Sequence, residues 1–337
     1  MSVVDVPQAL MLGSRFRALS IGLSPVTIPY DSGNTRSAEV PKTYLTKDIF
    51  VRLTGDLVVT STVTLIDEAP LGLLSSIELA GDGNETLWKM HGRDAYRLAQ
   101  LFHGKASELV APATGVATNP FSASFILSAE AVNMAVPVDS YLDLREFEKT
   151  ELRVTWAAAS SVFSAGAATI SAATQLECFA NQSTEGLGSI GFRRFISFDD
   201  RVIAATATDL TIMVPRTGLL AGILFHTWRD NNRVDNVVNF MTLTSDSSHD
   251  HFKRRPWASL QLENVQRYQL DGAAVVGNRI TGYAYLDLLE DGRMAAAINT
   301  EALNELKLVM DVTKTSGVET LRSTYVFFKP LRRAVAG

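Results

Sequence analysis

The residues best suited to metal chemistry in this sequence are the histidines of one short segment. His249 and His251 are one residue apart, and His226 is a conceivable third ligand. On a strand or in a loop, a His-x-His pair can place both imidazoles on one side, where they could bind zinc. A pair lacks the third protein ligand that a catalytic zinc needs, and basic residues follow it directly. We therefore interpret the segment as a solvated loop and predict no metal site.

Other catalytic patterns are incomplete. The sequence has neither a nucleotide-binding glycine loop nor a Gly-x-Ser-x-Gly nucleophile motif. Cys178, the single cysteine, lies in a strand-like context that favours a buried structural thiol over a nucleophile. A glycosidase would use two carboxylates, and the candidates are Asp143, Glu146 and Glu148, or Glu290 and Asp291. We predict no catalytic residue and no cofactor.

Two small basic clusters lie near the ends of an otherwise acidic chain. The first is Arg15 and Arg17, and the second includes Arg332 and Arg333. Attraction to anionic lipid is worth about 1 kcal/mol for each basic residue near the surface. The clusters could therefore face a membrane or the interior of a particle. The alternative is that both are solvated tails.

Composition limits the class of protein. The chain has 337 residues, which suggests two domains, and 46% of them are hydrophobic, enough for ordinary cores. A net charge of −5 gives no global attraction to nucleic acid. One cysteine allows no intrachain disulfide. No run of about 18 apolar residues is present, so we expect no transmembrane helix.

The elements that would position these residues are mostly β-strands. Runs of β-branched and aromatic residues alternate with Gly, Pro, Asn and Asp turns, a pattern typical of antiparallel sandwiches. Turns are expected at 54–56 and 81–84, a helix at 94–102, a helical turn at 299–304 and a long polar excursion at 229–256. We predict strands at 49–53, 57–60, 62–66, 73–79, 86–90, 121–129, 151–157, 168–171, 174–180, 195–198, 210–214, 219–227, 283–288, 306–312 and 321–328.

Two short stretches recur in the same order at nearly one separation. Gly72-Leu73-Leu74-Ser75-Ser76-Ile77 is echoed by Gly218-Leu219-Leu220-Ala221-Gly222-Ile223, and Tyr141-Leu142-Asp143-Leu144 returns as Tyr285-Leu286-Asp287-Leu288. Collinear matches suggest two structural copies, with each pair on equivalent strands. We predict an N-terminal arm at 1–42, a first domain at 43–190 and a second at 191–337. A strand within 1–42 that pairs with the body is the alternative to a free arm.

A distinctive part of the first copy is residues 62–79 with 84–87 and the helix that ends at His103. Together with residues 285–293 and 304–308 of the second copy, it resembles the major capsid proteins of tailless icosahedral phages with an internal membrane. The resemblance covers most of residues 45–330. It implies an all-β fold of two tandem eight-stranded antiparallel jelly rolls, a double jelly roll, with a few short helices. It also implies homotrimers of pseudo-hexagonal outline that tile an icosahedral shell.

The resulting prediction is a non-enzymatic, self-assembling major capsid protein of such a bacteriophage. Its expected partners are its own copies, neighbouring trimers, penton or minor capsid proteins and the inner membrane, with no specific nucleic acid. It would be located in the virion and assembled in the host cytoplasm. The alternatives are a minor or vertex capsid protein, and a two-sandwich protein that binds carbohydrate or acts on glycosides. The last would need exposed aromatic residues along a groove, and the four tryptophans are scattered in the sequence.

Overall fold

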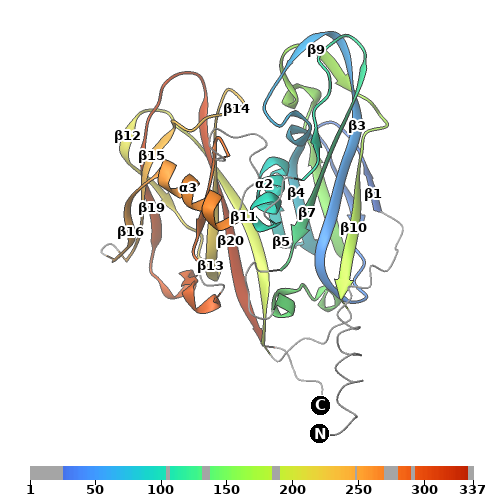
Figure 1. The fold of residues 1–337 in the computed structure, drawn as a ribbon. Helices are drawn as coiled ribbons and strands as arrows, with labels where there is room; N and C mark the ends of the chain where they lie inside the picture. The colour runs from blue at the N-terminus through green and yellow to red at the C-terminus, as the bar shows by residue number, and fades with distance from the viewer. Residues whose placement is uncertain are drawn as a thin grey trace, which may run out of the picture.

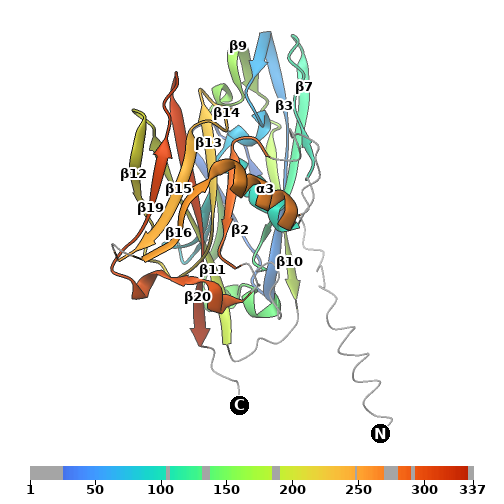
Figure 2. The same ribbon diagram turned by 60° about the vertical axis from the view of Figure 1, so that its left-hand side comes forward.

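The chain folds into two β-rich halves that lie side by side with their strands roughly parallel to the long axis (Figure 1, Figure 2). This computed structural model describes residues 26–103, 107–130, 137–183, 190–246, 249–268, 280–289 and 293–332. The strands form because polar and apolar residues alternate along them. In Thr150–Trp156 and in Leu306–Val312 every second residue is buried.

The first half is a jelly roll of two facing four-stranded layers. One layer has the order β1-β10-β3-β7 and the other has the order β2-β8-β4-β5, with antiparallel neighbours throughout. The strands are β1 (Val26–Pro29), β2 (Thr35–Glu39), β3 (Leu45–Leu65), β4 (Leu74–Gly81), β5 (Glu85–Met90), β7 (Thr118–Ser128), β8 (Thr150–Trp156) and β10 (Gln175–Ser183).

The second half repeats this strand order. One layer is β11-β20-β13-β17 and the other is β12-β19-β15-β16. The strands are β11 (Ile190–Val202), β12 (Ala207–Met213), β13 (Leu219–Arg229), β15 (Val238–Ser245), β16 (His249–Pro256), β17 (Tyr283–Asp287), β19 (Leu306–Val312) and β20 (Glu319–Arg332). The predicted double jelly roll is therefore confirmed as the fold.

Shorter elements complete the described chain. The additional strands are β6 (Leu109–Val110), β9 (Phe163–Ile170), β14 (Asn232–Arg233) and β18 (Ile298–Asn299). The short 3-10 helices are η1 (Ala69–Leu73), η2 (Pro137–Ser140), η3 (Leu144–Glu146), η4 (Ala159–Ser161), η6 (Met294–Ala296) and η7 (Thr300–Ala302). The last of these is the helical turn predicted within 299–304.

Two α-helices occupy equivalent places in the two halves. The predicted helix is α2 (Gly92–His103), which follows β5, and α3 (Trp257–Tyr268) follows the corresponding strand β16. The helix α2 lies between the two jelly rolls, whereas α3 packs on the second jelly roll and also contacts α2 (Figure 1). The helix α3 was not predicted, because it begins directly after the polar excursion and its apolar face is weakly marked.

The two jelly rolls share a sheet. A parallel pairing of β5 with β11, at Trp88 and Ile196, joins their layers into one ten-stranded sheet. Trp88 is buried, and its indole nitrogen donates to the Arg194 carbonyl at 3.1 Å. One hydrophobic cluster includes side chains from both halves, such as Leu98 of α2 and Leu224 of β13. The halves are thus joined through backbone pairing and through the core.

Two predictions about individual segments were wrong. The turn at 54–56 does not exist, because β3 runs unbroken through it. Gly55 is needed there for space: a Cβ atom would overlap the side chain of Thr174. The polar excursion at 229–256 contains β15, which has no charged residue, and β16, whose charged side chains are exposed or half-buried. Of the predicted arm, residues 26–29 and 35–39 form β1 and β2 and pair with the body, the alternative considered for this region.

The repeated sequence stretches do not occupy equivalent strands. Residues 72–77 span the end of η1 and the start of β4, whereas 218–223 open β13, the counterpart of β3. Residues 141–144 form an isolated bridge and the start of η3, whereas 285–288 lie mainly on β17. The predicted register is therefore wrong, although the chain does contain two copies of one topology.

Candidate functional site

The most unusual chemistry of the molecule is a buried polar cluster between the jelly rolls. At its centre is Asp94 of α2, which is fully buried. One carboxylate oxygen lies 3.0 Å from Nδ1 of His226 on β13. The other accepts from Thr324 at 3.1 Å and from Arg322 at 3.4 Å, both on β20. One acidic side chain of the first jelly roll thus contacts two strands of the second.

A second carboxylate repeats this arrangement. Glu68 precedes η1 and has a left-handed backbone with φ of 54°, which is uncommon for a residue with a side chain. It accepts from Nε of Arg97 at 2.6 Å and from the hydroxyl of Tyr283, on β17, at 2.9 Å. Arg233 of the second jelly roll lies 3.4 Å away. These contacts hold the unusual backbone conformation, and those with Tyr283 and Arg233 cross the junction.

Charge compensation keeps both carboxylates ionised. Burial acts to raise the pKa of Asp94, but the Arg322 guanidinium and the His226 hydrogen bond outweigh it and lower that pKa. Burial likewise opposes ionisation of Glu68, and Arg97 and Arg233 outweigh it, so that its pKa is also lowered. The junction therefore contains ion pairs away from water, where breaking one partner is costly.

His226 is neutral in this setting. Burial lowers its pKa, and the neighbouring carboxylate of Asp94 only partly offsets this. The ring stacks on Tyr283, with centroids 4.1 Å apart, and lies 4.7 Å from Trp228. Its Nε2 atom has no hydrogen-bond partner among the described residues. The imidazole therefore serves as a flat packing surface with one hydrogen bond, not as an exposed ligand.

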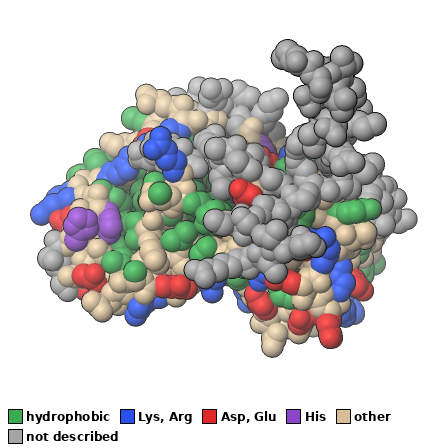
Figure 3. All heavy atoms as spheres, turned by 90° about the horizontal axis from the view of Figure 1, so that it is seen from below, with side chains coloured by type: hydrophobic (Ala, Val, Ile, Leu, Met, Phe, Trp, Pro, Cys, Tyr) green, Lys and Arg blue, Asp and Glu red, His purple; other side chains and the backbone are tan. Residues whose placement is uncertain are grey.

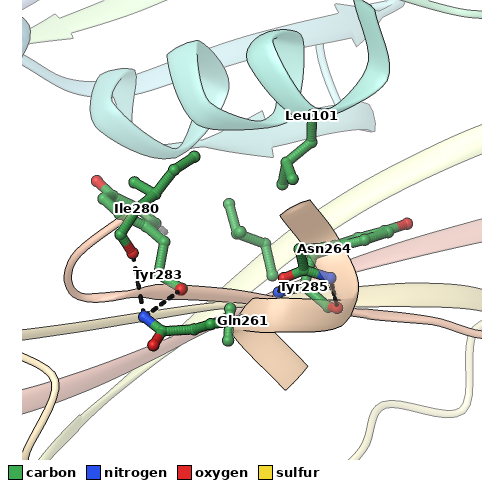
Figure 4. A pocket seen from close by; sticks show the side chains of 8 residues that line it. Leu101, Gln261, Asn264, Ile280, Tyr283 and Tyr285 are labelled. Atoms are coloured by element: carbon green, nitrogen blue, oxygen red, sulfur yellow. Dashed lines mark hydrogen bonds between the residues drawn. The ribbon is translucent and has the colours of Figure 1, made fainter. Parts of the chain in front are cut away.

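A small apolar pocket lies beside this junction, between α2 and α3 (Figure 4). Leu101 lines one side, and Gln261 and Asn264 of α3 line the other. The polar groups already have partners. Nε2 of Gln261 donates to the carbonyl of Tyr283 at 3.1 Å, and the amide of Asn264 both donates to and accepts from the backbone of Tyr285 at 2.6 and 2.7 Å. These bonds tie α3 to β17.

The chemistry of the junction is structural. The carboxylates of Asp94 and Glu68 are buried, so a solute cannot reach them in this arrangement. What the cluster can do is to fix the orientation of one jelly roll against the other, because each ion pair has strict distance requirements. A sequence signal existed: Arg93, Asp94, Arg97 and Gln100 place polar groups around a short helix that is otherwise apolar. This signal alone does not predict the junction, because the partners on β13 and β20 are more than 120 residues away in the sequence.

The histidine candidates are not brought together. His249 and His251 lie on β16 with rings 4.9 Å apart, and Nε2 of His251 is 3.1 Å from the Ser245 hydroxyl. His226 is in the buried junction instead. In the part of the chain that the structure describes, no group of three His, Cys, Asp or Glu side chains could hold a metal ion.

The other candidates are dispersed. Arg15, Arg17 and Arg333 lie outside the described residues, and Arg332 is the last residue of β20. Asp143 pairs with Arg145, and Glu146 pairs with Arg193, while Glu290 and Asp291 lie outside the described residues. Three tryptophans, Trp88, Trp156 and Trp257, are buried, so they line no exposed groove. No described helix has the length and apolar character to cross a membrane.

The sequence matches no protein-family model and no curated protein. The structure is similar to the major capsid protein (MCP) of Sulfolobus turreted icosahedral virus (STIV), with a TM-score of 0.68 and 12% identity over 91% of this chain and 94% of that chain. It is also similar to the major capsid protein P2 of bacteriophage PM2, with a TM-score of 0.58 and 14% identity over 93% and 99% of the two chains. For the capsid of the virus PBCV-1 the TM-score is 0.59, with 13% identity over 91% and 93%. The chain thus shares the double-jelly-roll fold of viral major capsid proteins, as the sequence resemblance implied.

Proposed function

We propose that this chain is a non-enzymatic major capsid protein, which forms pseudo-hexagonal homotrimers that tile an icosahedral shell around an internal membrane. The observation that carries the proposal is the agreement over nearly the whole chain, with 91% of this chain and 94% of the STIV protein superposed. Such agreement includes both jelly rolls and their relative placement. The buried junction supports it, because a building block of a regular shell needs one fixed shape.

The proposed domains are the first jelly roll up to about residue 190 and the second from 191 onward. We place the end of the molecule where β20 finishes, opposite β9 in Figure 1, toward the interior of the particle. Arg15, Arg17, Arg332 and Arg333 would then face the membrane. Neighbouring trimers and penton or minor capsid proteins would be the protein partners, in a virion assembled in the host cytoplasm.

Assembly is tested on the purified full chain by size-exclusion chromatography with light scattering over a range of concentrations. The expected mass is three times the 36.7 kDa of the chain, with pseudo-hexagonal particles in negative-stain micrographs. A monomer at every concentration would contradict the proposal.

Membrane contact is tested separately by flotation with vesicles of phosphatidylcholine, with and without phosphatidylserine. We expect binding to the anionic vesicles that weakens when Arg15 and Arg17 are both replaced by Ala, by roughly 2 kcal/mol in total. Equal binding of the variant, or none by either protein, would contradict the membrane-facing assignment without affecting the capsid role.

A further inference from the structure

One end of the first jelly roll contains no ionisable side chain. We define the charge-free tip as residues 57–66, 109–119 and 157–171. These three segments contain no Asp, Glu, Lys, Arg or His, whereas 20% of the whole chain is Asp, Glu, Lys or Arg. Their surface is made of Ser, Thr, Ala, Gly and Val instead. Figure 3 shows the opposite end of the molecule, where basic and acidic side chains are both abundant.

The three segments are joined by hydrogen bonds into one body. The far half of β3 is in the middle and pairs with β9 on one side. On the other side, the amides of Val59 and Val63 donate to the carbonyls of Ala117 and Thr114 at 2.9 and 3.1 Å. The hydroxyl of Thr60 donates to the Ala167 carbonyl at 3.1 Å. The charge-free tip is therefore one folded surface at the upper end of Figure 1.

The outer edge of this body is open. Among the described residues β9 pairs with β3 and with no second strand. Natural proteins usually protect such edges with charged residues or proline. The other edge strands of comparable length have charges: Arg36 and Glu39 in β2, Asp209 in β12, and several in β16. In β9 neither a charge nor a proline is present, and its pairing with β3 is irregular around Gly166.

Apolar side chains are exposed in the segment that lies on the other side of β3 from β9. Val110 is 48% exposed and Val116 is 67% exposed, and both lie in the charge-free tip. Elsewhere on the charge-free tip the exposed surface offers hydroxyl and methyl groups, including those of Thr60, Thr62 and Thr169. Small uncharged side chains let two backbones come close and leave no buried charge behind.

We propose that the charge-free tip is a contact surface between copies of this chain. The kind of molecule that binds the charge-free tip follows from the charge pattern. Contacts between copies related by a rotation axis repeat the same side chains, so a charge close to the axis would lie near its own copies and destabilise the contact. A surface for a basic or acidic partner would have the opposite charge, and this one has none. This inference rests on the self-assembly proposed above, and it identifies one surface through which copies of the chain contact each other.

Cross-linking through an introduced thiol tests the contact directly. The native Cys178 is buried, and burial raises its pKa to about 12, so it should not react in the folded protein. Ala165→Cys, Ala167→Cys and Thr169→Cys would each place one thiol on the exposed face of β9. With a flexible bismaleimide we expect covalent dimers within the assembled protein. Ala295→Cys, an equally exposed site on η6 at the other end of the molecule, is the matched control and should cross-link only at the level of chance collision.

Introduced charge gives an independent measurement. Ala167→Asp should raise the dissociation constant of the oligomer by more than about tenfold, because it places an unpaired charge in a contact that is otherwise free of charge. Ala295→Asp should leave it unchanged, and Ala167→Ser should keep assembly intact. Thermal melting of each variant at low concentration confirms that the subunit is folded.

The possible outcomes separate the two proposals. If Ala167→Asp leaves the dissociation constant of the oligomer unchanged and thiols on β9 do not cross-link, the proposed contact surface is wrong. The capsid role would not be affected by that result. The charge-free tip would then face solvent or a different partner. A wild-type chain that stays monomeric would overturn both.

Discussion

Asp94 shows at the residue scale how the two jelly rolls are held together. Its carboxylate is fully buried, and its contacts with His226, Arg322 and Thr324 all cross the junction. Arg322 is itself held by a bidentate pair with Asp200, at 2.6 and 2.8 Å. Such a network contributes less to net stability than to a unique arrangement, because desolvating the charges offsets much of their attraction. Removing one member is nevertheless costly.

Replacement of Asp94 by Ala should therefore lower the free energy of unfolding by about 3–5 kcal/mol, since it leaves His226 buried without its hydrogen-bond partner and Arg322 with Asp200 as its one remaining carboxylate. Urea denaturation followed by circular dichroism measures this. Asp209→Ala, an exposed acidic residue on β12, is the control and should change stability by less than about 0.5 kcal/mol. Equal changes in the free energy of unfolding for the two substitutions would show that the Asp94 contacts do not stabilise the fold more than an exposed side chain does.

The pH dependence of stability follows from His226. Its pKa in the folded protein lies below its usual value, with Asp94, Glu68 and Arg322 as the charged groups around it. As the pH falls below about 6.5, the unfolded chain takes up a proton that the folded one does not, so stability declines. In wild type this residue should contribute a slope of up to about 1.4 kcal/mol per pH unit.

His226→Gln keeps a donor for Asp94 and removes the titration. Its unfolding free energy, measured from pH 7 to pH 5, should decline less steeply than that of wild type. His91, whose pKa burial also lowers, is unchanged in both proteins. Parallel curves for wild type and variant would contradict the assignment.

At the scale of elements, α3 protects the edge of β17 by imitating a strand. The side-chain amide of Asn264 pairs with both the N–H and the C=O of Tyr285, as a neighbouring strand would. Gln261 donates to the carbonyls of Tyr283 and Ile280 in the same way. The helix therefore ends the sheet and faces α2 at the same time.

Asn264→Leu should destabilise the protein by about 2–5 kcal/mol, because two buried backbone groups lose their partners. The matched control is Ser259→Leu on the exposed face of α3, which should have a small effect. Chemical denaturation measures both variants. A tolerated Asn264→Leu would mean that water replaces the amide.

The length of β3 depends on Gly55. A methyl group there would overlap the side chain of Thr174, so Gly55→Ala should cost about 1–3 kcal/mol. Adding Thr174→Ala should restore part of this loss, and the thermal shift of the double variant measures the coupling. Gly115→Ala is the control, since nothing lies within 4 Å of its added Cβ. Additive losses for the two substitutions at 55 and 174 would contradict a direct clash.

The sequence predicted those elements whose signal is local. Alternating strands such as β8 and β19, the turn after β4, and α2 are determined by neighbouring residues, and all are present. A turn was wrongly predicted at Gly55. The glycine is needed there because of its close contact with Thr174, which lies 119 residues away in the sequence. The short repeats were misleading because four identical letters carry little information about topology. The junction was missed because its partners meet only after both jelly rolls have formed.

At the scale of the whole molecule, the two jelly rolls should unfold as one unit. They share a sheet through β5 and β11, a hydrophobic cluster and the ion pairs of the junction. Hydrogen exchange with mass spectrometry, at increasing urea, should show β8 of the first half and β19 of the second losing protection together. Loss of protection in one half at distinctly lower urea would show that they are independent folding units.

The pairing of β5 with β11 also limits how the molecule can bend. A hinge between the jelly rolls would have to separate two strands and pull charged side chains out of their pairs, so this joint is stiff. If these molecules tile a closed surface, curvature cannot be taken up inside a subunit. Each tile would stay flat and rigid, and the radius of the particle would be decided entirely by the dihedral angle at which neighbouring tiles meet.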